Sequence, residues 1–131
     1  MRDDMIWETP EGASVQWTAV GEGLVDWGRY VERWRALCPG VPFQIETISG
    51  FSRAFPYKTE AFWSNYSKRP EALAKFETLA KKGHALPPFQ APPGADKKIA
   101  EQNYQREEVE RSVKYCKEVL GLGLRSAAAR G

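Results

Sequence analysis

Residues 41–50 read Val-Pro-Phe-Gln-Ile-Glu-Thr-Ile-Ser-Gly, and this stretch decides the predicted fold. Val41, Phe43 and Ile45 alternate with Gln44 and Glu46, which is the two-residue period of a β-strand. The sequence therefore predicts a strand over residues 41–48, with the Glu46 carboxylate near its end. In α/β proteins functional groups gather at the carboxyl ends of strands. A buried charge there needs a metal, a hydrogen-bonding partner or a catalytic role.

The residues before this stretch predict a strand, a loop and a helix. An apolar run at residues 5–7 is closed by turn residues at 8–12, and residues 13–23 are predicted to be a loop ending in Gly-Glu-Gly. Asp26 suits the N-cap of a helix that Pro39-Gly40 ends. Strand, loop, helix and strand in this order indicate a parallel βαβ unit. The alternation of apolar and polar residues at 41–48 also suits an edge strand of an ordinary two-layer domain. The predicted apolar helix face consists of Trp27, Tyr30, Val31, Trp34, Leu37 and Cys38.

The remaining chain is predicted to be mainly helical. We expect a loop at residues 49–58, one or two helical turns at 59–66 and a helix at 70–82. The next segment, residues 84–95, holds four prolines and is predicted to be an extended connector. Asp96 should cap a last helix that ends near Leu120. Residues 126–131 are predicted to be a disordered tail.

Composition limits the classes of protein. The 131 residues suffice for one domain with a core, and 42% of them are hydrophobic. The 19 basic and 17 acidic residues nearly balance, so nucleic acid and membrane are not expected as partners. No apolar run would span a bilayer and no signal peptide precedes the first strand. Cys38 and Cys116 are expected to be buried free thiols in a reducing cytoplasm, and the single His84 excludes a multi-histidine metal site built from this chain alone.

Two stretches carry a resemblance to a known family. Val-Gly-Glu-Gly-Leu-Val-Asp-Trp at residues 20–27 and Cys-Pro-Gly-Val-Pro-Phe-Gln-Ile-Glu at 38–46 resemble the last third of xylose-isomerase-like TIM barrels, the superfamily of sugar phosphate isomerases and epimerases. In that family a GEG-type loop precedes the seventh helix, and the eighth strand carries a metal-binding glutamate. The resemblance implies an α/β fold, a partial TIM (β/α)8 barrel made of the last two strands with their helices and a C-terminal helical extension.

The resemblance also sets the expected domain boundaries and missing parts. Residues 1–50 would hold strands seven and eight with the helix between them, and residues 51–125 the loop, helices and extension of the same domain. Met1-Arg2-Asp3 resembles the end of the family's His-x-Lys/Arg-Asp pattern, whose histidine would precede Met1. The other metal-binding and catalytic carboxylates would lie further upstream. The resemblance thus implies a C-terminal fragment that is inactive by itself.

The family's chemistry assigns roles to few residues here. A divalent metal (Mn²⁺, Mg²⁺, Co²⁺ or Zn²⁺) in the full-length protein would polarise a carbonyl of a sugar or sugar phosphate, and two carboxylates would move a proton on the neighbouring carbon. Glu46 would be a metal ligand and a catalytic residue, with an exposed strand carboxylate as the alternative. The predicted substrate-binding residues are Glu22, Gln44, Arg53, Lys58 and Trp17.

Each of these substrate-binding predictions has an alternative. Gln44 either contacts the substrate or supports the metal ligands. Glu22 either orients sugar hydroxyls or caps backbone amides. Arg53 and Lys58 either bind an anionic group or are solvated loop cations. Trp17 either stacks on a sugar ring or belongs to the core.

A second reading of the whole chain is a non-catalytic small α/β binding or interaction domain, derived from such a barrel or merely similar to it. Such a domain would fold without further chain and form a homo-oligomer, whereas an enzyme fragment would need its missing N-terminal portion. A related barrel acting as a metal-dependent endonuclease is disfavoured, because such an enzyme would need a strongly basic face.

Overall fold

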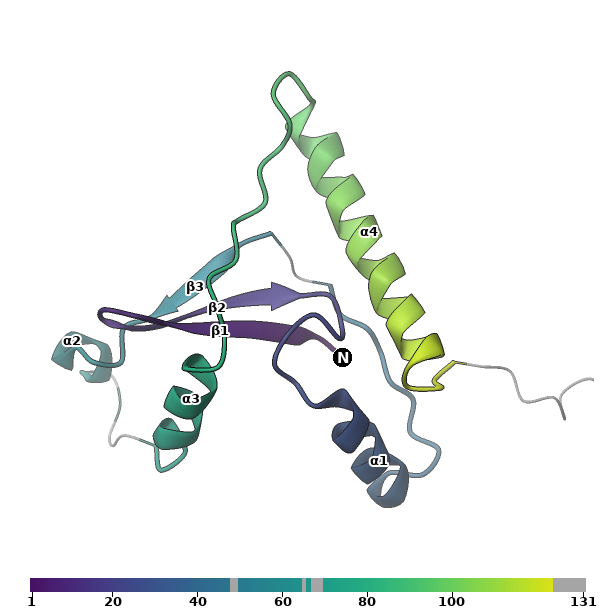
Figure 1. Ribbon diagram of the computed structural model, residues 1–131, viewed down its shortest axis with the longest axis horizontal. Helices are drawn as coiled ribbons and strands as arrows, with labels where there is room; N and C mark the ends of the chain where they lie inside the picture. Colours follow the sequence, from purple (N-terminus) through teal and green to yellow (C-terminus); the bar gives the residue numbers. More distant parts are fainter. Residues whose placement is uncertain (48–49, 65, 67–69, 124–131) are drawn as a thin grey trace, which may run out of the picture.

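The structure is a computed structural model that describes residues 1–47, 50–64, 66 and 70–123. It is a mixed α/β fold, as predicted (Figure 1). In chain order its elements are β1 (Asp3–Thr9), β2 (Gly12–Thr18), α1 (Trp27–Leu37), β3 (Ser52–Phe55), α2 (Glu60–Trp63), α3 (Leu73–Ala80) and α4 (Lys97–Glu118).

Within the described residues, β1, β2 and β3 form one antiparallel sheet in that order. β1 and β2 are a hairpin in which Asp3 lies opposite Thr18 and Thr9 lies opposite Gly12. The prediction of a loop at residues 13–23 is therefore wrong for its first half. Residues 13–18 alternate apolar and polar side chains, and the short Pro-Glu turn before them returns the chain along β1. The predicted loop at residues 49–58 likewise contains β3, which pairs with β2.

Residues 41–47, the described part of the strand predicted at 41–48, do not pair with the sheet. Pro42 lacks a backbone N–H, and the segment packs through Phe43 and Ile45 against apolar residues instead. Residues 44–46 nevertheless run beside the first residue of the chain. The Met1 amino group donates to the Gln44 carbonyl oxygen, and the Glu46 N–H donates to the Met1 carbonyl oxygen over 2.9 Å.

The two long helices begin where the sequence predicts. Asp26 accepts a hydrogen bond from the Arg29 N–H over 3.1 Å and so caps α1. Asp96 does the same for α4 through the Ile99 N–H, at 3.0 Å. The connector at residues 84–95 has neither helix nor strand, as predicted. It runs from α3 to the N-terminal end of α4 (Figure 1). α2 and α3 are shorter than predicted, and the predicted tail at 126–131 lies outside the described residues.

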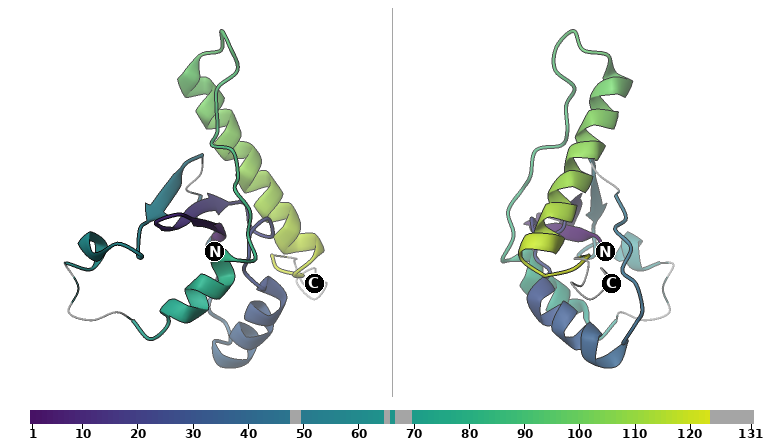
Figure 2. Two further views of the ribbon diagram at one scale, coloured as in Figure 1. Left: turned by 60° about the vertical axis from the view of Figure 1, so that its left-hand side comes forward. Right: turned by 90° about the vertical axis from the view of Figure 1, so that its right-hand side faces the viewer.

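Two separate apolar clusters hold the elements together. One joins α1 to the end of α4 and contains Val20, Trp27, Val31, Cys116 and Leu120. The other lies between the hairpin and α3 and is centred on Ala13, Tyr57 and Ala80. The left view of Figure 2 shows α1 and α3 on the same side of the hairpin, with α4 extending past it.

The cysteines agree with the prediction in part. Both are free thiols, and Cys116 is buried. Cys38 is exposed, so its predicted burial is wrong. It follows the last residue of α1 as the C-cap, beyond the packed turns of that helix. Among the described residues, no helix is long and apolar enough to cross a membrane.

Candidate functional site

The loop before α1 is anchored by the fully buried carboxylate of Asp3. Its Oδ1 accepts hydrogen bonds from the backbone N–H groups of Asp4 (2.9 Å) and Val25 (3.1 Å). Its Oδ2 accepts from the Gly21 N–H (2.9 Å) and from the Trp27 indole N–H (2.8 Å). A carboxylate with four donors is well compensated for its burial. Asp3 therefore ties the Gly-Glu-Gly loop and the start of α1 to the first strand.

The two glycines of this loop are required by close packing. Gly21 has φ +94°, and a Cβ there would collide with the Tyr115 ring. A Cβ on Gly23 would collide with the Asp3 carboxylate and the Asp4 carbonyl oxygen. The Gly-x-Gly spacing thus follows from where Asp3 and α4 lie.

Between these glycines, Glu22 points outward to α4. Its carboxylate receives hydrogen bonds from Arg111, with Nε–Oε1 at 2.6 Å and Nη2–Oε2 at 3.4 Å. The hydrogen bond to Glu22 raises the pKa of Arg111, against the opposing effect of partial burial. Neither role predicted for Glu22 describes this ion pair, which fastens the loop to α4.

Glu46 and Trp17, both predicted as site residues, are brought together by Arg2. The Arg2 guanidinium carbon lies 5.0 Å from the centroid of the Trp17 ring, a cation–π distance. Arg2 Nη1 lies 3.9 Å from Glu46 Oε2, and the Glu46 side chain is 66% exposed. Trp17 also contacts the Phe51 ring at 5.0 Å. The sequence showed Arg2 only as part of a family pattern, and nothing local in it predicted this bridging role.

Asp4 is a site residue that the sequence did not reveal. It lies directly opposite Trp17 in the hairpin, so the two side chains share one face of the sheet. Its Oδ1 is buried and has no hydrogen-bond partner among the described residues. Burial raises the pKa of the Asp4 carboxyl, an effect that the Arg2 charge reduces and the Asp3 charge increases. We call Arg2, Asp4, Trp17 and Glu46 the Trp17 cluster.

This cluster offers a definite chemistry. It combines an indole ring, two carboxylates and one cation, which are group types that bind the apolar side and the hydroxyl groups of sugars. A carboxyl group with a raised pKa can also hold or release a proton nearer to neutral pH than an ordinary aspartate. No described group of three or more His, Cys, Asp or Glu residues could hold a metal ion, so Glu46 fits at most one ligand of a set.

The raised pKa of Asp4 makes stability depend on pH. Because the folded state holds the Asp4 proton more tightly than the unfolded state, this contribution is complete below the ordinary pKa of 3.8 and is lost as pH rises through the higher folded pKa. Asparagine does not titrate, so the Asp4→Asn variant should not lose this stability as the pH rises. Its free energy of unfolding relative to the wild type should therefore increase from about pH 3.5 towards pH 7. Urea unfolding followed by circular dichroism across this range measures it. A constant difference between the two proteins would contradict the prediction.

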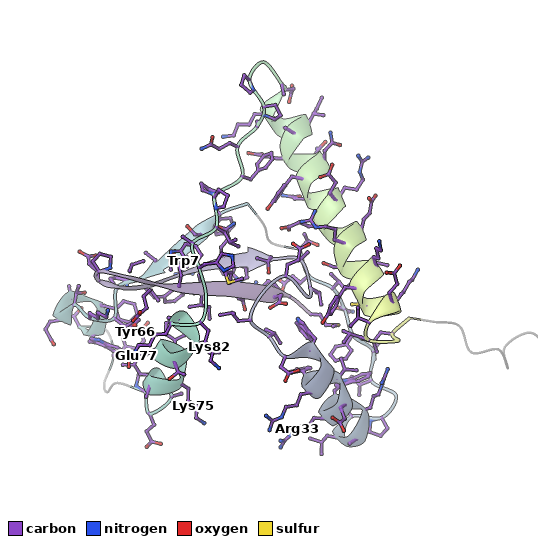
Figure 3. All side chains as sticks on the ribbon, viewed as in Figure 1. Trp7, Arg33, Tyr66, Lys75, Glu77 and Lys82 are labelled. Carbon is purple, nitrogen blue, oxygen red and sulfur yellow. The ribbon has the colours of Figure 1, made fainter. Side chains whose placement is uncertain are left out.

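The other predicted substrate-binding residues lie apart from this cluster. Arg53 is exposed on β3 and covers the Phe55 ring, its guanidinium carbon 5.9 Å from the ring centroid. Lys58 donates its backbone N–H to the Glu11 carbonyl oxygen at the hairpin turn, the end of β1 opposite to Arg2. The Gln44 side chain is exposed. In the middle of α1, Arg33 projects into solvent (Figure 3).

Comparison of the chain with protein-family models, with curated proteins and with solved structures found no match. The resemblance to xylose-isomerase-like barrels therefore stays a prediction that depends on the residues quoted for it.

Proposed function

We propose that this chain is the C-terminal part of a metal-dependent sugar or sugar phosphate isomerase or epimerase with a xylose-isomerase-like barrel. One observation carries the proposal: Met1 donates to Gln44 and accepts from Glu46. In neighbouring parallel strands, the N–H of one residue donates to one residue of the other strand. Its carbonyl oxygen accepts from the residue two positions further along that strand, and Met1 follows this pattern. α1 lies between the two segments in the chain, as the helix of a βαβ unit does.

In this arrangement the β1–β2 hairpin is an excursion at the end of the seventh barrel strand. Met1 and Arg2 would end that strand, and residues 43–46 would form the eighth beside it. The Trp17 cluster then lies at the carboxyl ends of both strands, which is where barrel enzymes keep their active sites. Asp3 supports the same reading, because it fixes the Gly-Glu-Gly loop between the hairpin and α1.

Each residue of the cluster has a separate role in the proposed reaction. Glu46 would be one ligand of a divalent metal and also one of the two carboxylates that move the proton, the remaining ligands coming from the other barrel strands. The metal supplies polarisation of the substrate carbonyl when bound. Arg2 holds Glu46 and Trp17 in place, Trp17 offers its ring to the sugar, and Asp4 is placed to hold a proton beside it.

The test is Glu46→Gln in the complete barrel that contains this chain. Deuterium uptake from D₂O at the carbon beside the carbonyl, measured by NMR on a ketose with Mn²⁺ present, should fall by about 10²- to 10⁴-fold because a proton-transfer group is lost. Mn²⁺ affinity, measured by calorimetry, should fall as well. Glu11→Gln is the matched control, since Glu11 is an exposed carboxylate at the hairpin turn, and it should change neither value.

Unchanged deuterium uptake and Mn²⁺ affinity in Glu46→Gln would overturn the assignment. The alternative function, a non-catalytic binding or interaction domain, predicts a different result. In that case the 131-residue chain folds cooperatively by itself, and no barrel containing it exchanges deuterium into any sugar.

A further inference from the structure

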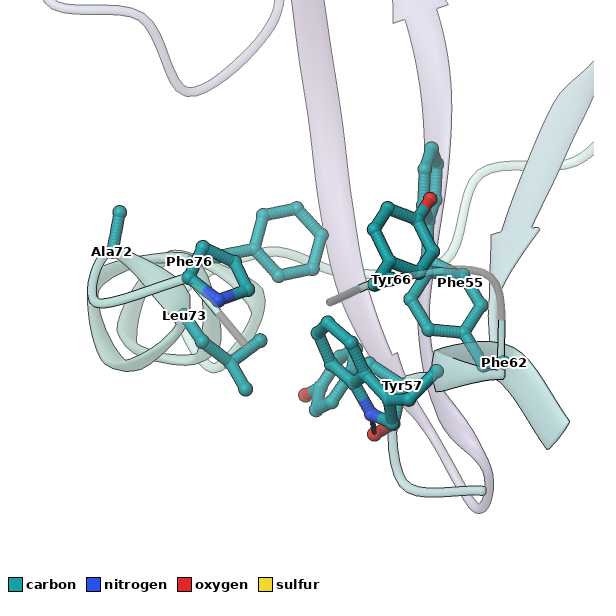
Figure 4. Close-up of a pocket in the computed structure, with 9 residues that line it drawn as sticks. Phe55, Tyr57, Phe62, Tyr66, Ala72, Leu73 and Phe76 are labelled. Atoms are coloured by element: carbon teal, nitrogen blue, oxygen red, sulfur yellow. Dashed lines mark hydrogen bonds between the residues drawn. The ribbon is translucent and has the colours of Figure 1, made fainter. Parts of the chain in front are cut away.

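A hollow beside α3 is lined by aromatic rings. It has a volume of about 450 Å³ and lies between α2, α3 and the end of β3 (Figure 4). This volume is in the range of sites for small molecules. Among the residues that the structure describes, no charged side chain lines it. The described lining includes six aromatic rings: Phe55, Tyr57, Phe62, Trp63, Tyr66 and Phe76.

The rings form two walls. On one side Phe62 stacks with Tyr66 at 5.5 Å between centroids, and Trp63 meets Phe62 edge-on at 5.0 Å. On the other, Tyr57 meets Phe76 edge-on at 5.8 Å. The Trp63 wall is tied to the Tyr57 wall by a hydrogen bond from the Trp63 indole N–H to the Tyr57 carbonyl oxygen (2.6 Å), the dashed line in Figure 4. This hydrogen bond joins the two walls.

Two carboxylates, Glu77 and Glu8, act on Tyr57 in the lining of the hollow. Burial raises the pKa of the Tyr57 hydroxyl, and the charges of Glu77 and Glu8 raise it further. The hydroxyl oxygen is buried without a hydrogen-bond partner among the described residues. Glu77 is half-buried on α3, whereas Lys75 and Lys82 on and after that helix are exposed (Figure 3). The Arg53 guanidinium carbon lies 5.9 Å from the centroid of the Phe55 ring, so a cation already lies beside that part of the lining. At the Tyr57 wall, the negative potential of the ring faces and the charges of Glu77 and Glu8 favour a cation.

We propose that this hollow binds a small organic cation of the quaternary ammonium class. Such a cation has an apolar surface that fits walls without charged side chains, and its spread positive charge interacts with ring faces. A compact ammonium or metal ion would lose its hydration here and find few oxygen ligands in return. The site goes beyond the proposed isomerase function, because none of its residues belongs to the Trp17 cluster.

Choline and its uncharged carbon isostere, 3,3-dimethyl-1-butanol, test the proposal on the 131-residue chain. Each is titrated while the indole N–H resonance of Trp63 is followed by NMR. Choline should shift this resonance and bind at least about tenfold more tightly than the isostere, which corresponds to a cation–π contribution near 1.4 kcal/mol. Tyr66→Leu should weaken choline binding by about fivefold or more. Tyr66 is 56% exposed, so its loss should leave the fold intact.

Tyr30→Leu is the matched control. Tyr30 is 52% exposed and contacts Trp27 and Phe43 outside the hollow, so choline affinity should not change. Equal binding of choline and the isostere would overturn the proposal in favour of a plain apolar pocket. Absence of a Trp63 shift with millimolar choline would also overturn it, as would an unchanged choline affinity in Tyr66→Leu.

Discussion

Asp3→Ala is expected to lower the free energy of unfolding by about 3–5 kcal/mol, because it leaves buried donors without an acceptor. The Asp3 carboxylate receives four hydrogen bonds, including those of the Gly21 and Val25 N–H groups and of the Trp27 indole. A domain of this size has a total stability of only about 5–15 kcal/mol. Guanidinium unfolding followed by circular dichroism should therefore show a large shift of the midpoint or an unfolded protein.

Two further variants separate charge from volume. Asp3→Asn keeps the shape but turns one acceptor oxygen into an amide donor that faces other donors, so most of the loss should remain. Asp4→Asn is the matched control at the next position. Its Oδ1 has no hydrogen-bond partner among the described residues, so near neutral pH this variant should be as stable as the wild type or more so. Asp3→Ala with a loss below about 1 kcal/mol would contradict the role given to this carboxylate.

The helices could be predicted because their signals are local. α1 and α4 each begin one residue after an aspartate that caps them. The proline-rich connector before α4 could be predicted for the same reason. Capping and apolar spacing act within a few residues, so one sequence suffices to find them.

The strands were harder, because their partners decide them. In β2, apolar and polar residues alternate as in a strand with one apolar face. The two-residue turn at Pro10-Glu11 was the sequence signal that this strand forms a hairpin with β1. Residues 41–47 have the same alternation but belong to no strand of the sheet. Their backbone makes two hydrogen bonds to Met1. Alternation indicates a half-buried extended segment, and neighbouring chain decides whether it becomes a strand.

The site shows the same division. Glu46 and Trp17 could be selected from the sequence as residue types suited to metal and sugar binding. Asp3 and Asp4 are adjacent carboxylates that the sequence cannot distinguish, yet one has four donors and the other has an unpartnered buried oxygen. The distinction arises because three of the four donors to Asp3 come from 18, 22 and 24 residues further along the chain.

Gly83→Ala is expected to destabilise the fold by about 2–3 kcal/mol through a backbone collision. Gly83 follows α3 where the chain crosses β1, and an added Cβ would overlap the Ile6 carbonyl oxygen and lie 3.2 Å from the Met5 sulfur. A carbonyl oxygen cannot rotate away as a side chain can, so the end of α3 must move off β1. The movement would open the cluster around Ala13, Tyr57 and Ala80. Thermal unfolding should show a lower Tm for this variant.

Gly28→Ala is the matched control for the same chemical change. Gly28 lies inside α1, and the nearest atom to its added Cβ is Asp26 Oδ1 at 3.7 Å, an ordinary contact. Alanine favours the helix over glycine by up to about 1 kcal/mol, so this variant should be more stable than the wild type. The two substitutions should thus shift the Tm in opposite directions. If Gly83→Ala is instead as stable as Gly28→Ala, α3 does not lie against β1 as described, and the hollow beside α3 loses one of its walls.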